Sequence, residues 1–352
     1  MGLQWLATNI NVTNGSMFHI SGSTYLGSGG EDGFNLVIDG TSCVLLTEAV
    51  LSGYNDERVR SQFAQYLPEG FTISSQGKVM QGDNEYTSLV TLSQSTITLA
   101  DDSDNSAIIA YTAGYRKNVK LQGRTLYKDG KWNTLCLPFS LNADQIAAHA
   151  DFAGATLMTM DVTEKNGFDV EDGTLYLWFK SATAIEAGVP YLVKWEKAAD
   201  YEGNEASYDI SNPVFENVTL SNSTAQTLAS ETAGLETVQM VGTYSPVGVT
   251  ADDKSILFLG NANTLYYSTV DRQIRSCRAY FSVPYINGHA GAKARAFALS
   301  FDGEETTGIL EVSANSNEVK DDVWYLLDGV RLSGKPTQRG MYINKGKKVL
   351  VK

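Results

Sequence analysis

Two aromatic side chains in one short segment are the residues of this chain best suited to holding a ligand. Tyr176 and Trp178 lie two positions apart, and Trp195 ends a second apolar segment. Alternate residues of an extended strand face the same way, so we expect Tyr176 and Trp178 on one face of a sheet and their leucine neighbours on the other. If the leucine face is the core, the two rings form a surface on which sugar rings can stack. The competing interpretation is that Tyr176, Trp178 and Trp195 cover a sheet or pack against loops.

An acidic segment offers oxygen atoms at alternate positions. Asp102, Asp104 and Ser106 have the spacing of a calcium loop. The EF-hand template also requires glycine at its sixth position and glutamate at its twelfth, where this chain has Ala107 and Ala113. We therefore predict a solvated turn and no cofactor, with calcium at Asp102 and Asp104 as the alternative.

The sequence shows none of the common catalytic motifs. The three histidines and three cysteines are His19, His149, His289, Cys43, Cys136 and Cys277. They are far apart and match no metal-binding or disulfide template, and the sequence has no nucleophile elbow, zinc-protease motif or phosphate loop. We expect the cysteines to be small buried residues on strands. With 40 acidic residues, the number of carboxylates does not predict a glycosidase pair. These observations favour a protein that is not an enzyme.

The charge of the chain limits its partners. Its 352 residues include 27 basic and 40 acidic side chains, a formal net charge of −13. A polyanion repels phosphate backbones, so nucleic acid is not an expected partner. No apolar run approaches the roughly 20 residues of a membrane-spanning helix. The charge lies mainly in turns, which favours a solvated body over an acidic cleft.

Short strands separated by polar turns dominate the elements that must position these residues. Residues 1–95 are predicted to be β-rich, with Asp39-Gly40 as a hairpin or turn signal. One helix is expected over 57–67, capped by Asn55 or Asp56.

Residues 96–302 show cleaner alternation and are predicted to form an antiparallel β-sandwich. Within it we expect a strand over 107–111, a hairpin across Asp129-Gly130 with Leu126 and Trp132 as packing residues, and a helix that starts at Asn142. Residues 303–322 are a predicted linker, and 323–352 are predicted to form two small hairpins. The fold class is therefore all-β.

Several segments resemble known protein families. The pieces, which occur in one order, are 123–139, 187–195, 242–246, 258–261 and 277–281. Together they resemble a module of large secreted and surface proteins of Bacteroides- and Prevotella-like bacteria. The last thirty or so residues resemble the end of a type IX secretion sorting domain, in which a Gly-x-Tyr strand precedes a lysine-bearing strand. The matching positions are Gly340, Tyr342, Lys347 and Lys348. More loosely, residues 1–95 resemble the last coils of a parallel β-helix, in which each coil stacks on the next.

These resemblances imply an extracellular or cell-surface location and a structural or adhesive role, with glycans or host or bacterial surface proteins as partners. No signal peptide is recognisable at the N-terminus, so we expect the chain to be a fragment of a longer protein. Two alternatives stay open. One is a carbohydrate-binding accessory module that uses Tyr176 and Trp178, and the other is the remnant of a β-helical polysaccharide-active enzyme.

Overall fold

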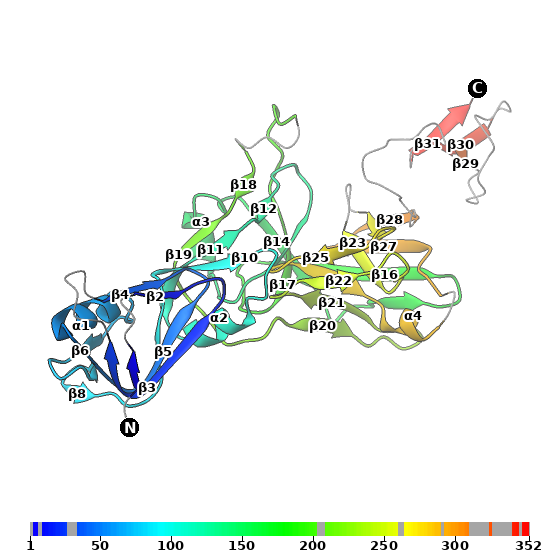
Figure 1. Cartoon of the computed structure of the whole chain (residues 1–352). Helices are drawn as coiled ribbons and strands as arrows, with labels where there is room; N and C mark the ends of the chain where they lie inside the picture. The colour runs from blue at the N-terminus through cyan, green and yellow to red at the C-terminus, as the bar shows by residue number, and fades with distance from the viewer. Residues whose placement is uncertain are drawn as a thin grey trace.

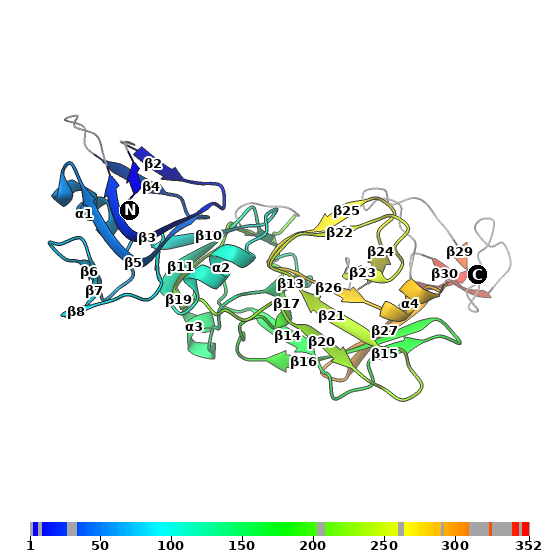
Figure 2. The ribbon, with the colours of Figure 1, turned by 60° about the horizontal axis from the view of Figure 1, so that its bottom comes forward.

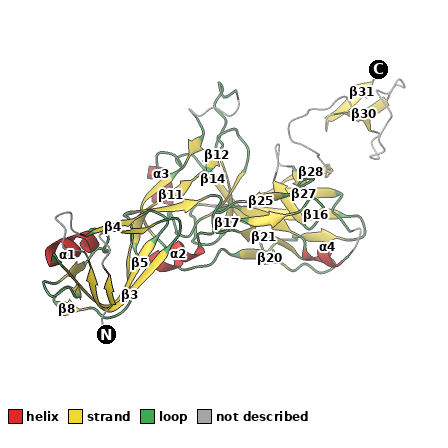
Figure 3. Ribbon diagram, viewed as in Figure 1, coloured by secondary structure: helices red, strands yellow, loops and turns green. Residues whose placement is uncertain are grey.

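The protein is built mainly from strands. A computed structural model describes residues 3–5, 9–26, 34–202, 208–259, 264–289, 292–309, 324–325, 340–344 and 347–351. Strands make up 45% of it and helices 10%, which confirms the all-β prediction. Figure 3 shows the helices in red, as short segments beside the yellow strands. Within the described ranges, none of the helices is long and apolar enough to cross a membrane.

The N-terminal region contains parallel strands that stack in register. Its strands are β1 (Leu3–Trp5), β2 (Asn9–Val12), β3 (Met17–Leu26), β4 (Asn35–Ile38), β5 (Cys43–Gly53) and β9 (Val90–Leu92). β2 pairs with β4, and β3 pairs with both β1 and β5, all in parallel. The turn that follows β2 repeats after β4, because Gly15 N donates to Thr41 Oγ1 and Ser16 N to Ser42 Oγ across a spacing of 26 residues. One coil of chain therefore lies directly on the next, as in a parallel β-helix.

Asp39 shapes the corner of the second coil. Its carboxylate accepts from the backbone N–H and hydroxyl of Thr41 and from the backbone N–H of Asn14. The expected turn at Asp39-Gly40 is present, but it joins strands of two different parallel sheets. The hairpin interpretation was therefore wrong, because β4 and β5 each pair with an earlier strand of the coil instead of with each other.

A helix and a small sheet complete this region. Helix α1 (Asp56–Ala64) begins as predicted at Asn55, whose side chain accepts from Arg58 N at 2.9 Å. Val59 and Phe63 of α1 are buried, and Phe34 stacks on Phe63. The strands of the small antiparallel sheet are β6 (Phe71–Ile73), β7 (Val79–Gln81) and β8 (Asn84–Glu85).

A second core lies where the coils meet the next part of the chain. Strands β10 (Thr96–Ala100), β11 (Arg116–Gln122) and β19 (Val214–Thr219) form a sheet in which β10 and β11 are parallel. Cys43 and Leu45 of β5 are buried in one cluster with Ile97, Val119 and Phe215. We name this cluster the shared core. The predicted boundary at 95/96 thus runs through shared hydrophobic packing. Figures 1 and 2 show the blue N-terminal strands joined to the cyan and green strands at this point.

Two further helices flank this core. Helix α3 (Ala143–Ala148) starts at Asn142, as predicted, with a capping box between Asn142 and Gln145. The strand expected over 107–111 is instead helix α2 (Ser106–Thr112). The strand prediction was wrong because a short apolar run is compatible with a helix as well as with a buried strand. In α2 both Ile108 and Ile109 face the shared core.

The remaining body is a sandwich of two sheets. The first contains β13 (Asn133–Cys136), β17 (Pro190–Lys194), β14 (Thr156–Met160), β16 (Thr174–Ala182), β27 (Ala296–Phe301) and β28 (Glu304–Ile309), with β15 (Gly167–Asp169) paired to β16. The second contains β20 (Thr227–Ser230), β21 (Val238–Gly242), β26 (Ala279–Ser282), β23 (Ile256–Leu259) and β24 (Leu265–Tyr267). Their inner faces enclose a core that includes Leu175, Leu177, Met240, Phe281 and Leu299.

Smaller pairs close the sandwich ends. β12 (Thr125–Leu126) pairs with β18 (Ile210–Ser211), β22 (Val247–Val249) pairs with β25 (Arg272–Ile274), and α4 (Pro284–Gly288) follows β26. The hairpin predicted across Asp129-Gly130 is absent, because β12 and β13 pair with strands distant in sequence. Leu126 and Trp132 are nevertheless buried, as expected.

The sandwich extends past its predicted end. Residues 304–309, assigned to a linker from sequence, form β28 and pair antiparallel with β27. The sequence does not predict this strand, because its first four residues are all polar and show no apolar alternation (Glu304, Glu305, Thr306 and Thr307). Residues 310–323 lie outside the described residues.

The C-terminal strands include one of the predicted hairpins. β30 (Gly340–Asn344) and β31 (Lys347–Val351) pair antiparallel, and β29 (Trp324–Tyr325) pairs with β30. In this register Gly340 is opposite Val351, Tyr342 is opposite Val349, and Lys347 and Lys348 are opposite Asn344 and Ile343. The hairpin predicted within 324–332 lies mostly outside the described residues.

Candidate functional site: the aromatic face of strand β16

Strand β16 has one apolar face and one aromatic face. Leu175, Leu177 and Phe179 are buried against the second sheet, whereas Tyr176 and Trp178 are half-buried on the opposite side. The alternation predicted from the sequence is confirmed, and the aromatic pair lies outside the sandwich core.

The two aromatic rings lie nearly side by side. Their centroids are 5.9 Å apart, with an angle of 29° between the ring planes. Small residues flank them on the neighbouring strands: Tyr176 pairs with Gly167 of β15 and Ala298 of β27, and Trp178 pairs with Ser300. These neighbours are short, and both rings stay partly exposed. We name Tyr176, Trp178, Ala298 and Ser300 the aromatic face.

A buried asparagine fixes the backbone under Trp178. Asn166 Oδ1 accepts from Trp178 N at 2.6 Å, and Asn166 Nδ2 donates to Asp161 O at 2.7 Å. The backbone oxygen of Asn166 in turn accepts from Thr232 Oγ1. The aromatic face therefore rests on a rigid polar support, with little main-chain freedom to lose on binding.

An ion pair borders the aromatic face. Lys180 Nζ lies 3.2 Å from Asp161 Oδ1, and Asp161 also accepts from the hydroxyl and N–H of Thr163. The hydroxyl of Thr163 is the main cause that lowers the pKa of Asp161. A carboxylate and an ammonium group beside flat rings can hydrogen-bond to hydroxyls of a ligand that stacks on those rings.

Ser300 contributes an unused polar group to the same face. Its side chain is buried, and its hydroxyl has no hydrogen-bond partner among the described residues. An unsatisfied buried hydroxyl carries a free-energy cost of about 1–3 kcal/mol.

Trp195, the third aromatic candidate, is a core residue. It is 4% exposed and packs edge-on against Phe152 at 5.4 Å, with Lys128 Nζ 5.4 Å from its ring centroid. Its side chain faces the shared core because Tyr191, Val193 and Trp195 alternate with Leu192, which faces the sandwich core. Trp195 is therefore not part of the aromatic face.

The two calcium candidates do not point to one centre. Asp104 accepts from Ser106 N at 2.9 Å and from the hydroxyl of Ser245, whereas Asp102 accepts from the neighbouring Ser103 hydroxyl. Asn105 closes the turn internally by bonding to the backbone of Ala100 in both directions. Among the described residues, no three histidine, cysteine or acidic side chains gather in a way that suits a metal ion.

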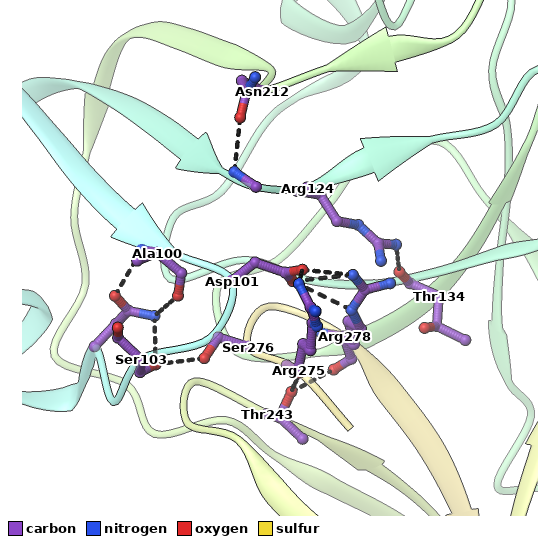
Figure 4. A network of polar contacts seen from close by, with 12 residues as sticks. Ala100, Asp101, Ser103, Arg124, Thr134, Asn212, Thr243, Arg275, Ser276 and Arg278 are labelled. Carbon is purple, nitrogen blue, oxygen red and sulfur yellow. Dashed lines mark hydrogen bonds and ion pairs between the residues drawn. The ribbon is translucent and has the colours of Figure 1, made fainter. Parts of the chain in front are cut away.

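Sequence reasoning missed a buried ionic cluster next to this turn. The carboxylate of Asp101 is almost fully buried and accepts from Arg278 Nη2 and Arg275 Nη1, as Figure 4 shows. Ser276 N donates to Asp101 O, and Ser276 Oγ donates to Ser103 O. The cluster ties the end of β10 to the segment that precedes β26. Its members are far apart in sequence, so no local motif signals it.

His149, His289 and the three cysteines have structural surroundings, whereas His19 is exposed on β3 beside the Thr47 hydroxyl. His149 packs against Phe152 and Phe215, and His289 stacks on Tyr285. All three cysteines are buried, as expected, and Cys43 and Cys136 lie on strands, but Cys277 lies in the turn before β26 and not on a strand. Burial raises the thiol pKa of Cys43 to about 11 and of Cys277 to about 12. These thiols are therefore poor nucleophiles at neutral pH.

Comparison of the chain with family models, with curated proteins and with solved structures finds no match.

Proposed function

We propose that the chain is a non-enzymatic module of an extracellular surface protein, with a structural and adhesive role. The observation that carries this proposal is the shared core, in which Cys43 and Leu45 of the coils are buried with Ile97 and Phe215. Flexible domain junctions have few apolar contacts across them. In this chain a hydrophobic cluster spans the junction between the coils and the next sheet. Such a rigid junction is what we expect of a spacer that holds a binding surface at a fixed distance.

The chemistry of the buried groups supports a non-catalytic role. Asp101 is neutralised by two arginines, and the buried thiols have raised pKa values. His149 is held between aromatic rings, with its Nε2 within 3.0 Å of Val214 O. These groups are already occupied in holding the fold. Hydrolysis of glycans, polysaccharides or peptides by the purified chain at enzyme-like rates would overturn this part of the proposal.

The extracellular location is proposed from the resemblance of the tail to sorting sequences. The antiparallel β30–β31 hairpin is compatible with that resemblance. A reporter protein fused to residues 323–352 should reach the surface of a bacterium with a type IX secretion system. The double substitution Lys347→Ala and Lys348→Ala should reduce that export, and equal export by the variant would contradict the proposed sorting role.

A second candidate function is carbohydrate binding by the aromatic face. The supporting observation is the pair of half-buried rings, Tyr176 and Trp178, which small residues flank on the neighbouring strands and which the Asp161–Lys180 ion pair borders. The C–H face of a sugar ring stacks on an aromatic ring, while its hydroxyls hydrogen-bond to charged groups at the border.

A glycan array tests this candidate directly. We expect the intact chain to bind at least one plant, mucin or bacterial glycan, and we expect Trp178→Ala to lose that binding. Tyr54→Ala is the matched control, since Tyr54 is 66% exposed and lies outside the aromatic face. Unchanged unfolding curves would show that Trp178→Ala folds. No binding to any glycan on the array would contradict the candidate.

A further inference from the structure

A second surface, whose lining contains neither Tyr176 nor Trp178, forms a polar hollow of about 570 Å³. It lies beside α3 and β19, which adjoin each other in Figures 1 and 2. The lining side chains on which the argument depends are Ser140, Gln145, Glu186, Asn217, Thr219 and Ser221. We call this surface the polar hollow. Its volume lies within the range of about 300–1,000 Å³ typical of small-molecule sites.

Strand alternation explains why the hollow is polar. Phe139, Leu141, Ile185 and Leu220 are buried in the shared core. Residues next to them in extended chain must face the other way, which brings Ser140, Glu186, Thr219 and Ser221 to the outside. A continuous apolar floor therefore carries a layer of hydroxyl, amide and carboxylate groups.

Backbone bridges hold the walls of the hollow. Leu141 and Ile185 exchange two hydrogen bonds, of 2.9 and 2.8 Å, and Phe139 pairs with Leu220. Ser140 Oγ accepts from Ala187 N at 3.0 Å, which fixes the hydroxyl beside Glu186. The groups are thus held in place before any ligand arrives.

Several polar groups in the hollow have no partner among the described residues. Gln145 Oε1 accepts from Asn142 N, but the Gln145 amide hydrogens make no bond. The side chains of Glu186, Asn217 and Thr219 likewise take part in no hydrogen bond or ion pair of the described residues. The hollow therefore offers a carboxylate as acceptor, two amides and several hydroxyls.

This set of groups selects among ligand classes. Glu186 is the one ionisable side chain among the described lining residues, so no cation is present to attract an anion. A single carboxylate also falls short of the several oxygen ligands that calcium prefers. Hydroxyl groups of a sugar both donate and accept, which matches the mixture of carboxylate, amide and hydroxyl groups.

We propose that the polar hollow binds a neutral saccharide unit, with Glu186 accepting from sugar hydroxyls and Gln145 and Asn217 donating to them. This inference shares the ligand class of the second candidate function but concerns a different surface. It stands whether or not Trp178 binds a glycan.

Nuclear magnetic resonance of the full chain tests the proposal. Neutral saccharides (glucose, galactose, mannose, xylose and N-acetylglucosamine, with their disaccharides) are titrated up to tens of millimolar while the side-chain amide signals of Gln145 and Asn217 are followed. At least one sugar should shift both signals in a saturable way. Glu186→Gln should weaken this binding about tenfold, since it replaces a charged acceptor by a neutral one of the same shape.

Two controls separate the polar hollow from the aromatic face. Glu216→Gln makes the same chemical change on an exposed residue of β19 outside the lining and should leave the affinity unchanged. Trp178→Ala should remove binding at the aromatic face without altering the shifts of Gln145 and Asn217. The proposal is overturned if no sugar shifts these amides, if Glu186→Gln binds as tightly as the parent, or if calcium or ammonium shifts them where sugars do not.

Discussion

Arg278 Nη2 donates to both carboxylate oxygens of Asp101, at 3.0 and 2.8 Å, across the junction between β10 and the segment before β26. Arg278 Nε adds a third contact at 3.3 Å. A charge-assisted contact of this kind fixes orientation as well as distance. The sheet of β10, β11 and β19 is thus linked by a polar clamp to the segment that leads into the second sheet of the sandwich.

Loss of the Asp101 carboxylate should destabilise the protein strongly. Asp101→Ala leaves the half-buried Arg278 without its counter-charge, and breaking a buried pair costs about 3–5 kcal/mol of unfolding free energy. Arg275→Ala should cost no more than about 1 kcal/mol, because the Arg275 side chain is 54% exposed. Urea unfolding of both variants measures the difference, and equal effects would argue against a clamp centred on Asp101.

Gly77 and Gly70 form a matched pair for testing how closely the chain packs against β5. Both have positive φ. A Cβ added at Gly77 would lie 1.9 Å from Leu51 O, whereas a Cβ added at Gly70 would have no other atom within 4 Å. Gly70→Ala should cost about 1–2 kcal/mol from backbone conformation alone. Gly77→Ala should lower the free energy of unfolding by at least twice as much, because the added Cβ forces β5 to move. Thermal and urea unfolding compare them, and similar losses would contradict this close approach.

The three thiols should resist modification in the folded protein. Burial raises their pKa values, so at pH 8 very little thiolate is present for reaction. Iodoacetamide at pH 8 should leave the native chain unmodified and add three groups once the chain is unfolded in guanidinium. Mass spectrometry counts the adducts, and rapid native labelling of Cys43, Cys136 or Cys277 would show that the thiol concerned is accessible.

Ser245 should control the titration of Asp104. Its hydroxyl is the main cause that lowers the pKa of Asp104 below the ordinary value of 3.8, and bonds from Ser106 add to it. A lowered carboxyl pKa stabilises the fold above the ordinary value, and this contribution is lost as the pH falls through the lowered pKa. Ser245→Ala should therefore raise the Asp104 pKa toward 3.8 and flatten the dependence of stability on pH in the acidic range.

Carbon-13 nuclear magnetic resonance of the Asp104 carboxyl measures this change. Asp161 is the internal control, because Thr163 lowers its pKa and Ser245 does not contact it. An Asp104 pKa that stays the same in Ser245→Ala would refute the assignment.

Local signals in the sequence predicted local features well. The caps at Asn55 and Asn142 and the two faces of β16 follow from hydrogen bonding and strand alternation within a few residues. Pairing across long distances was harder to predict. Asp129-Gly130 has the composition of a hairpin turn, yet β12 and β13 find better partners in β18 and β17.

The candidate sites likewise differ according to whether their residues are close together or far apart in the sequence. Tyr176 and Trp178 could be placed together because they share a strand. The polar hollow could not be predicted, since Ser140, Glu186 and Thr219 come from three separate segments that meet only in the folded chain. Trp195 lies in the core, the competing interpretation, because it follows β17, a strand buried on both faces, and one strand's alternation does not reveal that condition.

The parallel pairing of β16 with β27 has a consequence for the order in which the protein folds. Trp178 and its neighbour Ser300 belong to strands separated by most of the sandwich sequence. Contacts between such distant segments form slowly, because a long loop must close first. During synthesis β16 lacks this neighbour until β27 has been made, so chains that stop before Ala296 should expose one unpaired edge of β16 and self-associate.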